Sequence, residues 1–281
     1  MPYGVQRADE AGSLVTLRGV SRRSGLVQVL NRIDLDLPGN RVTALLGPAG
    51  AGKTTLCRAV SGSERIDSGS ITVAGEQPRR RRGGGVGALA DPCGLPAHRT
   101  VLQNVVPGRS WLRIRAADGE RRGLALLQRV GAAGYAAHYP AELSPEQQLR
   151  VAIARAVATG SRLILLDEPA ALLAPAASAS TAQPDGAAAT EPPATDPDLP
   201  DPAAAASAPA GPGLPTLLRE LAADGLAVLV ATGDPSLARA TADRVVFMEG
   251  GRIIEQGPPE EFFTTPRTAR ARDFLSAAAK R

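Results

Sequence analysis

The sequence predicts an α/β fold, with a mixed, mostly parallel sheet flanked by helices, an antiparallel β subdomain and a helical subdomain. Three continuous apolar runs, at residues 42–46, 163–166 and 227–231, indicate strands covered on both faces. Helical patterns separate these runs, and a glycine-rich turn directly follows the first. Buried strands that alternate with helices are typical of a doubly wound core.

The N-terminal part is predicted to be antiparallel. Residues 14–19 and 27–37 alternate apolar with polar side chains, which indicates a half-buried hairpin or meander. After the buried strand at 42–46, the pattern predicts a helix over 56–61 and a short strand over 70–73.

The middle of the chain is predicted to be helical from about residue 91 to residue 159. Leu124, Leu127 and Val130 share one helical face, and residues 149–157 carry another. Strands then return at the two apolar runs named above.

The C-terminal part is predicted to hold one more buried strand over 244–248. Gly250-Gly251 then indicates a hairpin. Helices over 258–263 and 267–279 close the chain.

Composition excludes several classes of protein. The two cysteines, Cys57 and Cys93, form no disulfide framework and fit a reducing, cytosolic setting. The N-terminus has no signal-peptide pattern, and no apolar run approaches the roughly 20 residues that span a bilayer. A membrane role would therefore require a partner. The basic run 79–82 lacks interleaved aromatic residues, so we interpret it as a solvated loop rather than a contact for nucleic acid or lipid headgroups.

One segment does not fit the α/β pattern. Residues 175–215 are almost entirely Ala, Pro, Ser, Thr and Gly, with five acidic residues and no basic one. Such a composition cannot offset its ordering entropy, so we predict a disordered insertion. The predicted organisation is a single domain over 1–281, which comprises the β subdomain and phosphate-loop core (13–90), the helical subdomain (91–159), the insertion (175–215) and the rest of the core (160–174 and 216–281).

The glycine-rich turn matches the phosphate-binding pattern G-x-x-x-x-G-K-[ST] between a strand and a helix. Its glycines let backbone N–H groups approach phosphate oxygens, and the following helix presents its positive end to the same anion. Lys53 is expected to reach the terminal phosphates, and the Thr54 hydroxyl to bind Mg²⁺. The candidate ATP-binding residues are Gly47, Pro48, Ala49, Gly50, Ala51, Gly52, Lys53, Thr54 and Thr55.

Lysine usage strengthens this interpretation. The chain has thirty arginines but only two lysines, Lys53 and Lys280. Lysine is therefore kept at the one position where a compact charge suits a phosphate. The core is predicted to be a P-loop NTPase core.

Two acids, Asp167 and Glu168, end the apolar run 163–166. A P-loop enzyme needs a carboxylate on a neighbouring strand to hold Mg²⁺, and Asp167 fits that role. Glu168 is the candidate catalytic residue, since it can orient or deprotonate the attacking water. Adjacent acids can also be plain turn residues, but the P-loop in the same chain favours the functional role.

The P-loop and the strand ending in Asp-Glu-Pro together resemble the ATP-binding subunits of ABC transporters. Residues 140–156 resemble the family's signature motif and its helix, and residues 245–263 resemble the C-terminal region of polar-amino-acid importer ATPases. The resemblance implies ATP and Mg²⁺ as cofactors and a position on the inner face of the cell membrane. The implied partners are a transmembrane permease, a second ATPase subunit in a homodimer or heterodimer, and a solute-binding protein.

The signature region departs from the family pattern. The family reads L-S-G-G-Q, whereas this chain has Pro145 and Glu146 in place of the two glycines. In the family, the residue at Ser144 and nearby N–H groups bind the partner's ATP. Pro145 removes a donor, and Glu146 adds a negative charge beside that anion. As a helix start the segment is good, with Ser144 as N-cap, Pro145 at the first position and Gln147 completing a capping box.

Other family positions also differ. The switch histidine position is Gly233, and neither His98 nor His138 is placed to substitute for it. The glutamine that links Mg²⁺ to the permease aligns with Asp91, which can offer an oxygen to the metal. Two further positions, the adenine-stacking aromatic and an acid of the interface loop, are Ser24 and Ala174.

Two functions therefore remain open. The first is a transport ATPase that uses Lys53, Thr54, Asp167 and Glu168. The second is a degenerate module that binds Mg-ATP with little hydrolysis and acts as a structural or regulatory half of a heterodimer. A GTP-dependent switch is disfavoured, because its base-reading motif needs a lysine that Lys280 cannot supply.

Overall fold

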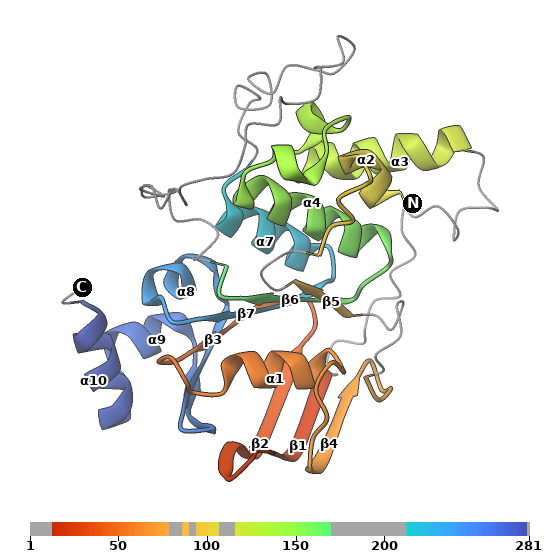
Figure 1. Cartoon of the computed structure of the whole chain (residues 1–281). Coiled ribbons are helices and arrows are strands. Elements are labelled where there is room, and N and C mark those ends of the chain that lie inside the picture. Colours follow the sequence, from red (N-terminus) through yellow and green to blue (C-terminus); the bar gives the residue numbers. More distant parts are fainter. Residues whose placement is uncertain (1–12, 79–85, 90–93, 107–115, 170–211, 280–281) are drawn as a thin grey trace, which may run out of the picture.

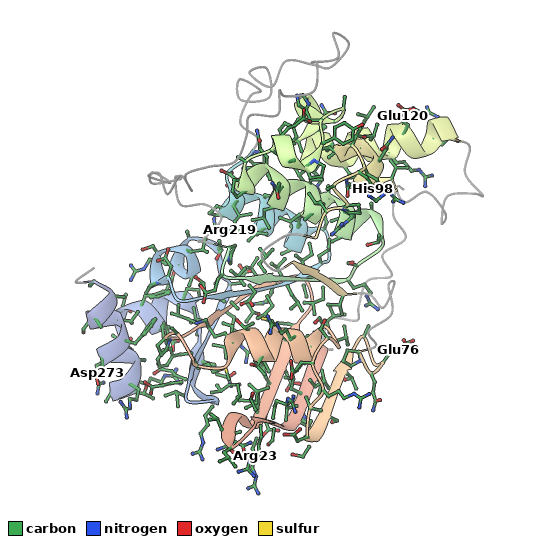
Figure 2. The ribbon with its side chains drawn as sticks, viewed as in Figure 1. Arg23, Glu76, His98, Glu120, Arg219 and Asp273 are labelled. Atoms are coloured by element: carbon green, nitrogen blue, oxygen red, sulfur yellow. The ribbon has the colours of Figure 1, made fainter. Side chains whose placement is uncertain are left out.

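The computed structural model of the chain describes residues 13–78, 86–89, 94–106, 116–169 and 212–279. Its strands form two sheets with helices between and around them (Figure 1). Charged residues such as Arg23, Glu76, Glu120 and Asp273 lie exposed at the outside of the molecule (Figure 2). The α/β class predicted from the sequence is confirmed.

The small sheet is antiparallel and has the order β2-β1-β4. It consists of β1 (Ser13–Ser24), β2 (Val27–Pro38) and β4 (Ser68–Val73). Leu17 on β1 lies opposite Leu35 on β2 and Ile71 on β4. Alternate residues of β2, namely Ile33, Leu35 and Leu37, are buried because side chains alternate between the faces of a strand. The predicted hairpin is therefore confirmed.

The large sheet is mixed and mostly parallel. Its strands, in spatial order, are β5 (Val86–Leu89), β6 (Leu163–Asp167), β7 (Ala227–Thr232), β3 (Val42–Leu46), β8 (Arg244–Glu249) and β9 (Arg252–Gly257). Neighbours are parallel except β8 and β9, which form an antiparallel hairpin. β3 and β7 are buried along their whole length, as their continuous apolar runs predict. β5 was not predicted, because the segment Val-Gly-Ala-Leu is short and two of its four side chains are small or absent, so it shows no apolar periodicity.

Helices cover both faces of the large sheet. α1 (Lys53–Val60) lies between the two sheets, whereas α4 (Pro145–Ala158) and α7 (Leu214–Ala223) lie on the opposite face (Figure 1). α2 (Val101–Val105) and α3 (Ala116–Arg129) pack against α4. The remaining elements are two 3-10 turns at Ala133–Tyr135 and Pro140–Glu142, and the helices α8 (Pro235–Thr241), α9 (Pro259–Thr264) and α10 (Ala269–Ala278).

Apolar clusters lie on both sides of the large sheet, and a third packs its β3 and β8 against α8, α9 and α10. The first cluster joins α1 to both sheets and includes Leu17, Leu56 and Leu165. The second joins the large sheet to α4 and α7 and includes Ile153 and Leu217. The large sheet therefore fixes α1 relative to the strand ends around it.

Two helix predictions need correction. α1 begins at Lys53 rather than at residue 56, because Gly52 adopts a left-handed φ of 99° and serves as its N-cap. Leu124 is 38% exposed, and Leu126 is buried beside Leu127 and Val130 instead. The predicted helical periodicity was correct, but the buried face of α3, which packs against α2 and α4, contains Leu126 in place of Leu124.

The predicted insertion over 175–215 ends too late. α7 begins at Leu214, whose side chain is only 3% exposed and packs in the core. The two prolines in 212–215 disguised this helix start, although proline is favoured in a first turn. Residues 170–211 lie outside the described part of the chain.

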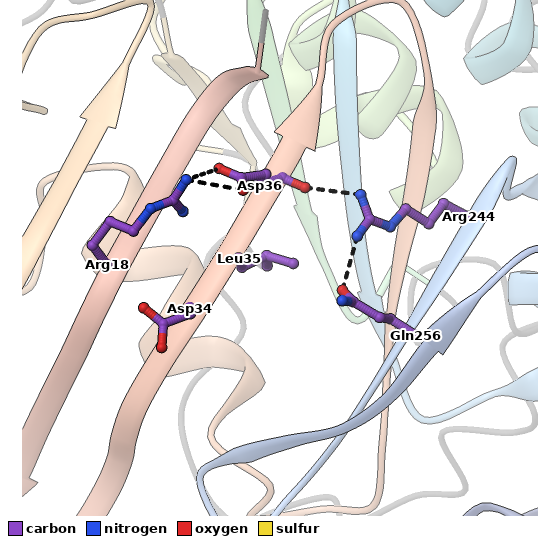
Figure 3. Close-up of a pocket in the computed structure, with 6 residues that line it drawn as sticks. All are labelled: Arg18, Asp34, Leu35, Asp36, Arg244 and Gln256. Atoms are coloured by element: carbon purple, nitrogen blue, oxygen red, sulfur yellow. Dashed lines mark hydrogen bonds and ion pairs between the residues drawn. The ribbon is translucent and has the colours of Figure 1, made fainter. Parts of the chain in front are cut away.

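A polar seam joins the two sheets away from the P-loop (Figure 3). Arg244 on β8 donates to the Asp36 carbonyl at 3.0 Å and to Gln256 Oε1 at 2.8 Å, and Asp36 Oδ1 lies 2.9 Å from Arg18 Nη2. These groups and Asp34 line a cavity of about 370 Å³. Because its lining residues mostly pair with one another, we interpret the seam as structural.

Candidate functional site

The turn between β3 and α1 has the backbone that an anion-binding loop requires. Gly50 and Gly52 both have positive φ, 77° and 99°. A Cβ at Gly47 would come within 2.1 Å of the Met248 carbonyl oxygen, so only glycine fits there. Gly52 provides no side-chain cap for α1. The helix therefore begins without a side-chain acceptor for its first N–H groups.

Lys53 is the first residue of α1, and its side chain is only 5% exposed. Its Nζ donates to the carbonyl oxygens of Gly47 at 2.8 Å and Pro48 at 3.1 Å. The same Nζ forms an ion pair with Glu168 Oε1 at 3.1 Å. Two carbonyl oxygens of the turn and the Glu168 carboxylate therefore fix the position of the ammonium group.

Thr54 and Asp167 meet although they are 113 residues apart in the chain. The Thr54 hydroxyl donates to Asp167 Oδ1 at 3.2 Å, because β6 ends beside the start of α1. Burial raises the pKa of the half-buried Asp167, the Thr54 hydrogen bond opposes this, and the nearby Glu168 carboxylate adds to it. The site therefore concentrates negative charge at a point where a cation would stabilise it.

Glu168 has an unusual backbone conformation, with φ of +48°. For a non-glycine residue this left-handed region costs about 1–2 kcal/mol. The N–H of Glu168 donates to the Ala231 carbonyl at 2.8 Å, and Glu168 Oε2 accepts from the N–H of Gly233 at 3.1 Å. β7 and the loop after it therefore hold both the main chain and the carboxylate.

The start of α4 differs from the start of α1. Ser144 accepts from the Gln147 N–H at 3.2 Å, and Gln147 Oε1 accepts from the Ser144 N–H at 2.8 Å. This confirms the predicted capping box. The expectation for Glu146 changes, because its carboxylate pairs with Arg150 Nη2 at 2.8 Å, one turn along the helix. The side chain of Arg150 is 7% exposed, and its Nη1 donates to the Val130 carbonyl.

The remaining candidates lie apart from this cluster or outside the described residues. Ser144 exchanges hydrogen bonds with Gln147 at the start of α4, whereas the Lys53 ammonium group contacts Gly47, Pro48 and Glu168. Asp91 and Ala174 fall in undescribed segments. Ser24 ends β1 and is exposed, and His98 is exposed beside the helical layer, away from α1 (Figure 2).

Sequence reasoning missed the contribution of Gly233. The sequence shows at this position only that the switch histidine is replaced by glycine. In the structure, the backbone N–H of Gly233 contacts Glu168. No sequence pattern reveals this contact, because every residue except proline has that N–H.

Two oxygen donors at the site fit a magnesium ion. Thr54 Oγ1 and Asp167 Oδ1 are neighbouring hard ligands, and Mg²⁺ in phosphate sites takes one or two protein oxygens and completes its shell with phosphates and water. Within the described ranges, no group of three or more His, Cys, Asp or Glu residues forms a metal cage. The donor set suits a metal that arrives with a phosphate ligand.

Comparison with known proteins assigns the chain to a family. A model described as ABC transporter matches residues 30–171, which include the P-loop, the capped start of α4 and the two acids at the end of β6, Asp167 and Glu168. The chain belongs to the ABC transporter family. This ABC subunit is 34% identical to the glutamate transport ATP-binding protein GluA of Corynebacterium glutamicum, over 93% of this chain and 98% of that protein.

Two further relatives from Escherichia coli K12 are also transport ATP-binding proteins. The glutamate/aspartate import protein GltL is 31% identical over 94% of this chain and 98% of its own length. The L-cystine transport protein TcyN is 35% identical over 88% of this chain and 91% of its own length.

Solved structures of ABC cassettes share the fold. An ATP-binding cassette in its ADP conformation has a TM-score of 0.67 and 17% identity, covering 95% of this chain and 99% of that one. A dimeric cassette bound to ADP and Pi after hydrolysis has a TM-score of 0.63 and 22% identity, covering 87% and 98%. Across the described ranges of this ABC subunit, no helix has the length and apolarity needed to cross a bilayer.

Proposed function

We propose that this ABC subunit binds and hydrolyses Mg-ATP to drive the import of a polar amino acid through a separate permease. The observation that carries the proposal is the convergence of Lys53 and Thr54 at the start of α1 with Asp167 and Glu168 at the end of β6. The amino-acid class is supported by the three relatives reported above, which are named for glutamate, glutamate/aspartate and cystine transport.

Each side chain has a distinct task in nucleotide binding. The loop 47–52 presents its N–H groups to phosphate oxygens, and Lys53 adds a positive charge that is already desolvated. Thr54 and Asp167 would hold Mg²⁺. When bound, the ion neutralises charge that develops on the transferred phosphoryl group.

Glu168 is the proposed general base. It is 45% exposed, so water reaches it, and its carboxylate is oriented by the Gly233 N–H. Phosphate oxygens would compete with Glu168 for Lys53, since both bind the same ammonium group. Their arrival would leave Oε1 able to accept a proton from, or orient, the attacking water.

The partners follow from the family. We propose that two ATPase subunits pair at a membrane permease on its cytoplasmic face, with a solute-binding protein in the same system. Pro145 and Glu146 make the start of α4 a poor anion site for a partner's nucleotide. A heterodimer in which the second subunit supplies an intact signature motif would have this defect at one of its two nucleotide sites, whereas a homodimer would have it at both.

A turnover assay tests the proposal. The subunit is purified alone and together with a candidate permease and a second ABC ATPase, and phosphate release is measured with Mg-ATP. Turnover that rises when the permease and a glutamate- or cystine-loaded binding protein are present supports the proposal. Nucleotide binding without phosphate release in every combination would favour the degenerate module instead, and stimulation by an unrelated solute would exclude the amino-acid class.

A further inference from the structure

Within the described part of the chain, the loop after β7 supplies one of the two donors that bind the Glu168 carboxylate. The N–H of Gly233 donates to Oε2 at 3.1 Å, and Lys53 Nζ lies 3.1 Å from Oε1. Each oxygen therefore has its own donor, and together they fix the direction and rotation of the carboxylate plane. The main chain of Glu168 is fixed as well, through its N–H bond to the Ala231 carbonyl at 2.8 Å.

The peptide that carries the Gly233 N–H is itself held on both sides. Thr232 is fully buried at the end of β7, and its carbonyl accepts from the Gly47 N–H at 3.3 Å. Asp234 donates its N–H to Thr232 Oγ1 at 3.0 Å and caps α8 by accepting from the Ser236 N–H at 2.8 Å. A donor fixed between a strand and a helix cap needs no reorganisation when it acts.

We propose that the backbone N–H of Gly233 is a positioning group for Glu168 during ATP hydrolysis. This rests on the proposed function, in which Glu168 orients or deprotonates the attacking water. Once phosphate draws Lys53 away, the Gly233 N–H is the donor that keeps the carboxylate directed. A main-chain group performs this task at a position that has no side chain.

Steric need does not explain the glycine. A Cβ at Gly233 would meet the Gly47 carbonyl oxygen at 3.6 Å, an ordinary contact, and its φ lies outside the left-handed region. Alanine at this position keeps the N–H, whereas proline removes it. Proline also requires an extended residue before it, and Thr232 ends a strand. Gly233→Ala and Gly233→Pro are therefore compared, because alanine keeps the donor and proline removes it. Proline also fixes φ and places its ring Cδ on the side of the Glu168 carboxylate, so the melting temperatures of both variants are measured as well.

Nuclear magnetic resonance tests the contact without turnover. Labelling glycine with ¹⁵N and threonine with ¹³C at the carbonyl selects Thr-Gly pairs, of which the chain has two, Thr159-Gly160 and Thr232-Gly233. Gly233→Ala removes one signal and so assigns both. Glu168→Gln is expected to shift the Gly233 amide proton upfield and leave Gly160 in place, because a carboxylate polarises a donor more than an amide does. An unmoved Gly233 signal would overturn the proposal.

Kinetics test the role of the contact. We expect the kcat of Gly233→Pro to lie roughly tenfold or more below that of Gly233→Ala, with KM for Mg-ATP within about threefold. In the Glu168→Gln background the ratio between the two variants should fall to about one, since the partner group is gone. A structural role alone would lower the melting temperature and keep the ratio in both backgrounds.

The outcomes separate this inference from the proposed function. If the wild type hydrolyses ATP and the proline-to-alanine ratio is near one, only the positioning role is overturned. If no phosphate is released by the wild type with its partners, the proposed function fails and the positioning role with it, even where the resonance shift shows the contact. Both effects together support the proposal.

Discussion

The starts of α1 and α4 are two helix N-termini with opposite designs. The N-cap of α1 is Gly52, which has no side chain to accept from the first turn, and the first helical residue is Lys53. The N-cap of α4 is Ser144, which completes a capping box, and the first helical residue, Pro145, has no N–H. In both helices the dipole favours an anion. The comparison teaches that donors left free of side-chain caps make an anion site, whereas donors already used make a stable helix start.

The largest expected effect comes from removing the charge at the open end of α1. Lys53→Ala should abolish the rise in melting temperature that Mg-ATP causes, along with any turnover. For the wild type, ligand at 100 times its Kd adds about 2.7 kcal/mol to the free energy of unfolding. Thermal melts with and without Mg-ATP measure the shift. Lys280→Ala, which changes the one other lysine, is the matched control, and a shift that survives Lys53→Ala would contradict the P-loop assignment.

Glu168→Gln separates binding from turnover at the same end. Loss of a general base should lower kcat by on the order of 10² to 10⁴, while the thermal shift with Mg-ATP persists. Phosphate release and melting curves are measured for Glu168→Gln and for a control, Glu120→Gln, which changes an exposed acid on α3 (Figure 2). Equal turnover in both variants would show that Glu168 is not the base.

Restoring glycine at the start of α4 should make this N-terminus a better anion site, as the start of α1 is. Pro145→Gly adds a backbone N–H donor, and Glu146→Gly removes a negative charge. Turnover of the double variant should therefore rise if a partner's nucleotide binds there. The change also takes from buried Arg150 its charged partner, which should cost roughly 1.5–3 kcal/mol of stability. Glu146→Gln removes the charge and the ion pair but leaves Pro145 without an N–H, so it separates these two changes from the added donor. Phosphate release and urea unfolding report the two consequences, and a fall in both would indicate that the cap matters more than the anion site.

Removing the cap alone should have a smaller effect. Ser144→Ala deletes the side-chain oxygen that accepts from the Gln147 N–H, and a lost N-cap costs about 1 kcal/mol. Urea unfolding measures the change. Ser276→Ala, at an exposed position on α10, is the control for removal of a hydroxyl. An equal loss in both variants would mean that the capping box contributes nothing.

The smallest effect lies far from both helix starts. The Arg23 N–H and then the Arg22 guanidinium lower the pKa of Asp67 in the folded protein. A lowered pKa stabilises the fold above the unfolded-state pKa, and this contribution is lost as pH falls through the folded-state pKa. Asp67→Asn should therefore be slightly less stable than wild type at neutral pH, with the difference closing in acid. Melting curves across that pH range check the sign, and a difference that grows in acid would contradict it.

The sequence by itself determined the P-loop, the capped start of α4 and every strand of the described residues except β5, since each depends on neighbours in the chain. The buried strands follow from continuous apolar runs, and the capping box from Ser144 and Gln147, three residues apart. Family resemblance, first indicated by residues 47–55 and the acids after 163–166, was likewise local in origin and is confirmed by the family match.

Only the tertiary structure decided which groups meet across the sheet. Asp167 reaches Thr54 because β6 and β3 each lie beside β7 in the same sheet, and the sequence does not record that strand order. Burial of Leu214 is also a matter of packing, because it depends on the core surface that α7 covers. The partner of Glu146 and the N–H that holds Glu168 were set by side-chain direction and backbone geometry, which residue types alone do not specify.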